Sequence, residues 1–166
     1  MKPDIDALQL RALLDRGLSD MAPTIGAILD DRTRDQLIRY LSLLTHWNRA
    51  YNLTAVRDPV LMVPRHLLDS LAVLPWLEPD PDQGPLLDAG TGAGLPGLIL
   101  AMARPDLPFT LLDSNGKKIR FVRLDIAELN LTNVEHVQTR LETYRPEIKF
   151  ATIVARALAG LPRLYA

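Results

Sequence analysis

A glycine-rich stretch between an apolar strand and an apolar helix constrains the fold of this chain more than any other feature. Residues 86–101 read LLDAGTGAGLPGLILA, with four glycines in the eight positions from Gly90 to Gly97. Glycine lets the backbone take positive φ and leaves no Cβ in the way of a ligand. Pro96 has its φ preset for the first helical turn. The stretch therefore predicts strand, tight turn and helix, with free N–H groups and the positive helix end facing a nucleotide-sized ligand.

Two classes of nucleotide ligand fit this stretch. Gly92-Ala93-Gly94-Leu95-Pro96-Gly97 matches the G-x-G-x-x-G pattern of dinucleotide folds. If the strand ends at Asp88, the pattern is instead Gly90-x-Gly92-x-Gly94, which resembles the S-adenosylmethionine loop of class I methyltransferases. A second acid, Asp113, closes the apolar run 109–113 and suits a ribose-binding role. Both ligands contain adenosine, so this acid leaves open an NAD-dependent oxidoreductase on a Rossmann fold. A non-catalytic S-adenosylmethionine-binding module is the other alternative.

The composition excludes several classes of protein. The 166 residues are 48% hydrophobic, carry a net charge of −1 and include no cysteine. Disulfides, cysteine–zinc sites and thiol catalysis are therefore excluded, and we expect a cytoplasmic protein. We find no apolar run of about 18 residues and no signal-peptide pattern, so we expect no membrane association. No histidines pair as metal ligands, so we expect no metal.

Residues 1–84 are predicted to form a helical extension with a proline-rich linker, and 85–166 a ligand-binding core. We expect a first helix at 7–16, ending at Gly17, and a second at 23–29. A longer helix follows and begins with a capping box of Thr33 and Gln36. A fourth helix is expected at 60–71. The linker covers 75–85. The extension has 9 basic and 12 acidic groups, and the core has 10 and 8. The surplus of positive charge therefore lies with the ligand site.

The core alternates strands and helices. Further strands are predicted at 109–113, 134–137 and 150–155, with a helix capped by Ser114 and stopped at Asn130. This order predicts a doubly wound parallel sheet with helices on both faces and right-handed crossovers. Ligands bind such sheets at the carboxyl ends of the strands. That edge would gather the glycine loop, Asp113, residues 139–142 and Arg156.

Four motifs in order give the chain a specific resemblance. They are WNRAYNLT at 47–54, RHLLDS at 65–70, the glycine loop, and LLDSNGKK at 111–118. Together they resemble ribosomal RNA small subunit methyltransferase G, also called glucose-inhibited division protein B. The resemblance implies a class I (Rossmann-like) methyltransferase core, S-adenosyl-L-methionine as cofactor, and methylation of N7 of a guanine in 16S rRNA or the 30S subunit. The family's sheet continues beyond a fourth strand, so we expect an incomplete sheet here, with 150–155 as an exposed apolar edge.

The resemblance and the spacing together nominate the site residues. The family usually has Ser where this chain has Ala155, and a small residue where it has Leu141. Arg65 and His66 are candidates for contact with the methionine end of the cofactor or with the guanine, and an Arg65–Asp69 ion pair is expected. Trp47 and Tyr51 fit core packing better than a stacking platform. The cofactor-binding candidates are Asp88, Gly90, Gly92, Gly94, Leu95, Asp113, Leu141, Glu142 and Arg156, and the RNA-binding candidates are Lys117, Lys118, Arg120 and Arg123, whose alternative is a solvated helix face.

The chemistry follows from residue types that the sequence lacks. Methylation at pyrimidine C5 needs a cysteine nucleophile, and the segment after the fourth strand, ARALAG at 155–160, lacks the (Asp/Asn)-Pro-Pro-(Tyr/Phe) loop used on exocyclic amines. Guanine N7 already exposes a lone pair, so no general base is required. Catalysis would then rest on proximity, which supplies roughly 7 kcal/mol or more.

Overall fold

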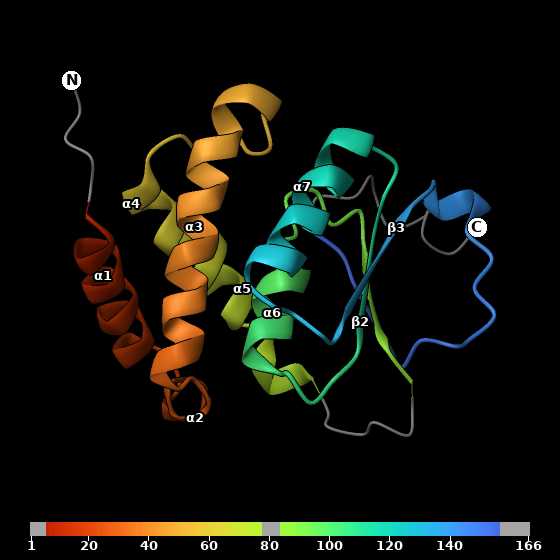
Figure 1. Cartoon of the computed structure of the whole chain (residues 1–166). Helices are drawn as coiled ribbons and strands as arrows, with labels where there is room; N and C mark the ends of the chain where they lie inside the picture. The colour runs from red at the N-terminus through yellow and green to blue at the C-terminus, as the bar shows by residue number, and fades with distance from the viewer. Residues whose placement is uncertain (1–5, 78–83, 157–166) are drawn as a thin grey trace.

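A four-stranded parallel sheet forms the core of the computed structural model, which describes residues 6–77 and 84–156 (Figure 1). The strands lie in the order β3-β2-β1-β4, and every neighbouring pair is parallel. They comprise β1 (Leu86–Ala89), β2 (Phe109–Asp113), β3 (Val134–Gln138) and β4 (Thr152–Val154). The predicted Rossmann-like α/β class is confirmed, although β4 is shorter than the predicted 150–155. The chain changes direction across the sheet between β1 and β4, which is where such folds bind ligands.

Helices cover one face of this sheet within the described residues. α6 (Gly97–Ala103) and α7 (Gly116–Glu128) follow β1 and β2 and pack with them into one apolar cluster. Two right-handed crossovers in the same direction put both helices on the same side. The other face carries a small cluster covered by Leu141, Tyr144 and Phe150. The second helical layer that the sequence predicted is therefore absent from the described part, where the β3–β4 connection holds only the short 3₁₀ turn η4 (Leu141–Thr143).

The N-terminal extension forms a further helical layer against α6 and α7, on the side away from the sheet (Figure 1). It comprises α1 (Ala7–Asp20), α2 (Pro23–Ile28), α3 (Asp31–Tyr51), α4 (Pro59–Met62), the π-helical turn η1 (Val63–Leu68), α5 (Asp69–Leu71) and the 3₁₀ turn η2 (Leu74–Trp76). One apolar cluster runs from this layer through α6 and α7 to the sheet. The extension and the core therefore share buried residues, while part of the predicted linker, 78–83, lies outside the described residues.

Two features of the extension differ from the prediction for reasons of packing. α1 continues through Gly17 to Asp20, because the glycine marks a close approach and not a helix end. A Cβ at Gly17 would lie 2.2 Å from Leu68 Cδ1. The segment predicted as one helix over 60–71 has a π-helical middle at Val63–Leu68, a local form that is frequent at functional sites.

Two helix caps also differ from those predicted. α3 begins after Asp30, whose carboxylate accepts from the Thr33 N–H at 2.8 Å. Gln36 instead donates to the Leu129 carbonyl at 2.9 Å, which ties α3 to the end of α7. α7 is capped by Asn115 and not by Ser114, since the Asn115 side chain accepts from two backbone N–H groups of the first turn. Asn130, at φ +53°, follows the helix end as predicted.

Candidate functional site

The glycine loop between β1 and α6 takes the backbone conformation that its composition predicts. Gly90, Gly92 and Gly94 have φ of 73°, 59° and 87°. These values lie in the left-handed region, which side chains other than glycine rarely adopt. Gly94 also has no room for a side chain, because a Cβ there would lie 2.3 Å from Leu98 Cδ1. The loop therefore depends on glycine for both backbone geometry and packing.

Asp88 supports this loop from inside the protein. Its side chain is fully buried, and its Oδ2 accepts from the Thr91 hydroxyl at 2.6 Å and from the Gly97 N–H at 2.8 Å. Oδ1 has no hydrogen-bond partner. Burial raises the pKa of Asp88 to about 6, against the opposing effect of the two hydrogen bonds. The first amide of α6 is thus bound by Asp88, so the prediction of free N–H groups at this helix end is wrong for Gly97.

Most other amides of the loop are also bound within the protein. Gly90 and Thr91 donate to the Leu112 carbonyl, and Gly94 and Leu95 donate to the Thr91 carbonyl. The prediction of a site built from free backbone amides is therefore wrong for these residues. What the loop offers instead is space, since a Cβ at Gly92 would meet nothing closer than 4.0 Å.

Two charged side chains lie beside that space. Asp113, 8% exposed at the end of β2, accepts from the Gly92 N–H at 2.9 Å through Oδ2 and from the Asn115 N–H at 2.8 Å through Oδ1. A carboxylate has about four lone-pair positions, so each oxygen can still accept from a ligand. Lys118 Nζ, on the first turn of α7, lies 4.0 Å from the Cβ position at Gly92. The loop thus has an acceptor held in place at Asp113 and a cation nearby at Lys118.

Tyr40 holds the loop from the helical extension, a role that the sequence reasoning missed. Its side chain is fully buried on α3, and its hydroxyl donates to the Ala93 carbonyl at 2.8 Å. Burial raises the pKa of Tyr40 well above its ordinary value, so the hydroxyl remains a donor. A tyrosine within an apolar helix stripe is a signal for such a contact, because a buried hydroxyl needs a partner.

Arg156, just after β4, joins the core to the extension. Its Nη1 donates to the Arg65 carbonyl at 3.1 Å and to Asp69 Oδ2 at 3.2 Å, and its Nη2 lies 3.4 Å from His66 Nδ1. Asp69 therefore pairs with Arg156, not with Arg65 as predicted. The expected i, i+4 pairing belongs to α-helices, and Arg65 lies in the π-helical turn.

His66 is a buried link in the same cluster, with 4% of its surface exposed. A guanidinium only donates, so Nδ1 accepts from Arg156, and Nε2 carries the proton that bonds Thr54 Oγ1 at 2.9 Å. Burial lowers the pKa of His66, and Arg156 lowers it further. His66 is therefore a neutral imidazole with both nitrogens used, and a cavity of about 330 Å³ lined by Asp69, Pro96 and Arg156 lies beside this cluster.

The remaining predicted residues lie at different depths. Leu95 belongs to the apolar core at 4% exposure, Leu141 is half-buried against the second face of the sheet, and Glu142 is exposed. The four cations of α7 separate: Lys118 lies at the glycine loop, and the other three, Lys117, Arg120 and Arg123, are exposed. No group of acidic or histidine side chains within residues 6–77 and 84–156 could hold a metal ion, and no helix there is long and apolar enough to cross a membrane.

Comparison with known proteins gives one consistent family. Residues 33–166 match the family model described as rRNA small subunit methyltransferase G. The protein named ribosomal RNA small subunit methyltransferase G from Legionella pneumophila is 46% identical to this chain over 160 residues. The protein of the same name from Alkalilimnicola ehrlichii is 55% identical to it over 137 residues. These alignments cover 96% and 82% of this chain, and 72% and 60% of the relatives. The counterpart from Ectopseudomonas mendocina is 53% identical over 84% of this chain and 64% of its own length.

Proposed function

Because the chain belongs to the ribosomal RNA small subunit methyltransferase G family, we propose that it transfers a methyl group from S-adenosylmethionine to N7 of a guanine in 16S rRNA. The observation that carries the proposal is the glycine loop itself, held between buried Asp88 and the Asp113 carboxylate at the carboxyl edge of a parallel sheet. The chain spans 60 to 72% of the length of the relatives compared here, so the activity of the whole protein is part of the proposal.

The residues at the loop fit this methyl donor. Asp113 can accept from ribose hydroxyls while its two backbone bonds keep it in place. The open space over Gly92 leaves room for the donor to approach the backbone, and Lys118 Nζ places a positive charge there that suits a carboxylate. When bound, S-adenosylmethionine supplies an electrophilic methyl group. The chain's own task is to bind and orient the donor at this edge.

The acceptor requires positioning and no proton transfer before attack. Guanine N7 presents a lone pair, and both nitrogens of His66 are used within the protein, so we nominate no general base. We place the guanine at the cavity of about 330 Å³ between Pro96 and the end of β4, where Arg156 lies with its guanidinium tied to Asp69 and the Arg65 carbonyl. Holding N7 in line with the methyl group and excluding water would supply the rate enhancement.

Donor binding is tested by calorimetry on the full chain. We expect S-adenosylhomocysteine to bind and NAD not to bind. Asp113→Asn should weaken S-adenosylhomocysteine about 10-fold or more, the cost of charge-assisted hydrogen bonds to ribose. Asp106→Asn is the matched control, since Asp106 is an exposed acid before β2 that pairs with Arg104. Binding of NAD in preference to S-adenosylhomocysteine would reject the methyl donor.

Methyl transfer is tested separately. The substrate is 30S subunits from a strain that lacks the modification, and the product is N7-methylguanine measured by mass spectrometry of the rRNA. Free 16S rRNA serves as the second substrate, which tells whether the assembled particle is recognised. A chain that binds the donor, remains folded and transfers no methyl group to either RNA would contradict the enzymatic proposal.

A further inference from the structure

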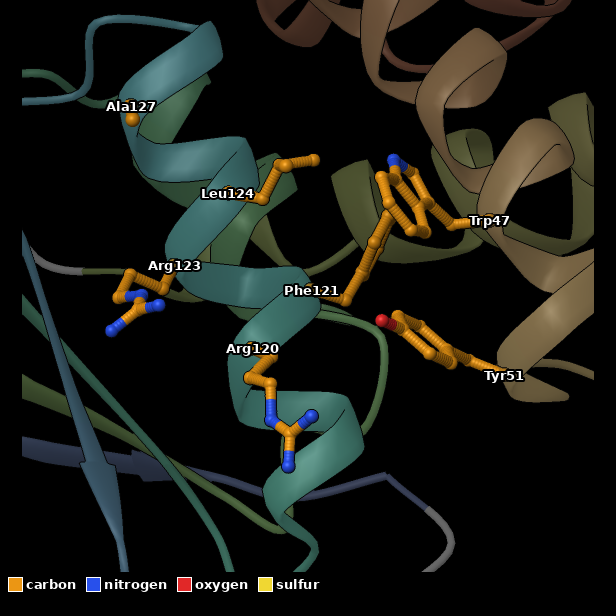
Figure 2. A pocket seen from close by; sticks show the side chains of 7 residues that line it. All are labelled: Trp47, Tyr51, Arg120, Phe121, Arg123, Leu124 and Ala127. Carbon is orange, nitrogen blue, oxygen red and sulfur yellow. The ribbon is translucent and has the colours of Figure 1, made fainter.

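A second cavity opens between the C-terminal end of α3 and the middle and C-terminal part of α7 (Figure 2). Its volume is about 490 Å³, within the range of small-molecule sites. Trp47 and Tyr51 line one side, and Phe121 and Leu124 of α7 line the other. None of these residues has a role in the proposed binding of the donor.

The aromatic wall of this cavity is already arranged as a stacked surface. The rings of Trp47 and Tyr51 lie 5.4 Å apart between centroids with an interplanar angle of 17°. Both side chains are only half-buried, and Figure 2 shows them facing α7 across the opening. Both side chains pack partly against the main apolar cluster, as the sequence predicted, and both also line the cavity, where an amphipathic ring can contact a ligand.

The rim of the cavity carries two uncompensated positive charges. Arg120 and Arg123 of α7 line it and are exposed. Within the described part of the chain neither guanidinium has an ion pair or hydrogen bond to another residue. An arginine fork beside an apolar slot is complementary to phosphate groups on either side of a base.

The cavity lies close to the donor site. α7 begins three residues after Asp113, and Arg120 lies about 6 Å along the helix axis from Gly116. Phe121, in the floor of the cavity, is 6.3 Å from the ring of Tyr40, whose hydroxyl binds the glycine loop. The opening is therefore near enough to the glycine loop for one strand to contact both.

We propose that this cavity is a second contact for the RNA substrate, which takes one unpaired base against Trp47 and Tyr51 while Arg120 and Arg123 bind the neighbouring phosphates. The inference rests on the proposed function, because it deepens the recognition of RNA. The base must be unpaired, since a base within a duplex is already stacked on both sides and cannot enter an aromatic slot. A protein helix is the other class of occupant, and the two free arginines favour an anionic strand over it.

Trp47 itself reports on this contact. The chain has two tryptophans, and the other, Trp76, is 81% exposed in η2. In a Trp76→Phe background, a single-stranded RNA of about 12 nucleotides, within the usual site size, should quench Trp47 fluorescence. The same RNA annealed to its complement should quench it much less.

Variants test the two parts of the site by anisotropy of the labelled single strand. Trp47→Leu should weaken binding about 10-fold, the typical loss of one base–aromatic stack, and Trp47→Phe should restore most of it. Arg120→Gln with Arg123→Gln should lower the slope of log affinity against log salt by about 1.4, or about 0.7 per phosphate contact. Arg32→Gln, an exposed arginine at the opposite end of α3, is the control for loss of charge.

Several outcomes overturn the inference. Unchanged Trp47 fluorescence on RNA binding, equal quenching by the duplex, or an effect of the arginines without one of Trp47 would each exclude a stacked base. The folding control is the affinity of Trp47→Leu for S-adenosylhomocysteine. If that affinity equals the one of the unmodified chain, weaker RNA binding reflects a lost RNA contact and not misfolding. If the unmodified chain binds S-adenosylhomocysteine and RNA but the fluorescence of Trp47 does not change, the inference is wrong and the proposed function still stands. If it binds neither, the proposed function fails with it.

Discussion

The buried carboxylate of Asp88 allows a sharp test of how the glycine loop is held. Asp88→Asn keeps an oxygen that can accept from the Thr91 hydroxyl and the Gly97 N–H, and its amide NH₂ takes the place of Oδ1, which has no partner now. Asp88→Ala removes both acceptors. The two variants therefore separate the charge of Asp88 from its hydrogen bonds.

The expected free energies differ in size and in pH dependence. Asp88→Ala leaves two buried donors unpaired, at about 1–3 kcal/mol each, so we expect about 2–6 kcal/mol of destabilisation. For Asp88→Asn the comparison depends on pH, because burial raises the pKa of Asp88 from 3.8 to about 6 in the folded protein. The Asp88 carboxyl therefore binds its proton more tightly in the native state than in the unfolded chain. This tighter proton binding stabilises the native state at low pH, and the stabilisation is lost as the pH rises from about 4 to 6. At about 1.4 kcal/mol per pH unit, Asp88→Asn should gain about 2 kcal/mol relative to the unmodified chain between pH 4 and pH 7.

Urea unfolding at pH 4, 5.5, 7 and 8 measures these differences, and calorimetry with S-adenosylhomocysteine at pH 8 measures the site. Asp88→Asn should bind within about threefold of the unmodified chain, because the side chain is buried and an amide oxygen can keep the bonds to Thr91 and Gly97. Asp88→Ala should bind about 10-fold more weakly or worse, because the loop loses its support. If Asp88→Asn loses as much affinity as Asp88→Ala, the charge of Asp88 contributes to ligand binding and its role is not only structural.

Three further predictions concern contacts around the site. Tyr40→Phe leaves the buried Ala93 carbonyl unpaired, so urea unfolding should show a loss of about 1–3 kcal/mol; no loss would mean that the extension does not hold the loop. Arg156→Ala removes one cause of the lowered His66 pKa, although burial is the larger cause, so NMR titration should find that pKa higher, and a fall would contradict the assigned contact. Asp125 is fully buried with both oxygens unpartnered, and burial raises its pKa to about 9. Its neutral form is the stabilising one, so from pH 5.5 to 7.5 the unmodified chain should lose about 3 kcal/mol relative to Asp125→Asn, and equal pH profiles would show that Asp125 titrates normally.

The sequence predicted the elements of the core well because their signals are local. The apolar run closed by Asp113 was predicted as 109–113 and forms β2 over that range. The alternate glycines predicted positive φ at Gly90, Gly92 and Gly94, since only the absence of a Cβ makes that conformation cheap. The helical extension was also predicted, because apolar residues recur along α3 at helical spacing.

Local patterns failed where a distant residue decides the outcome. Gly17 looks like a helix end, yet Leu68 packs against it and α1 continues. Thr33 and Gln36 match a capping box, yet Gln36 binds the end of α7. In each case a tertiary contact offered the residue a partner that no short window of sequence contains.

The sequence by itself determined that a glycine loop follows β1, that acids stand before and after it, and which family the chain resembles. Only the tertiary structure decided what those groups do. It turned the loop amides and Asp88 inward, left Asp113 and Lys118 at the open space, and made His66 a neutral link to Arg156. The reason is physical: a residue's type fixes which bonds it can make, whereas burial and the neighbours that the fold supplies fix which of those bonds form.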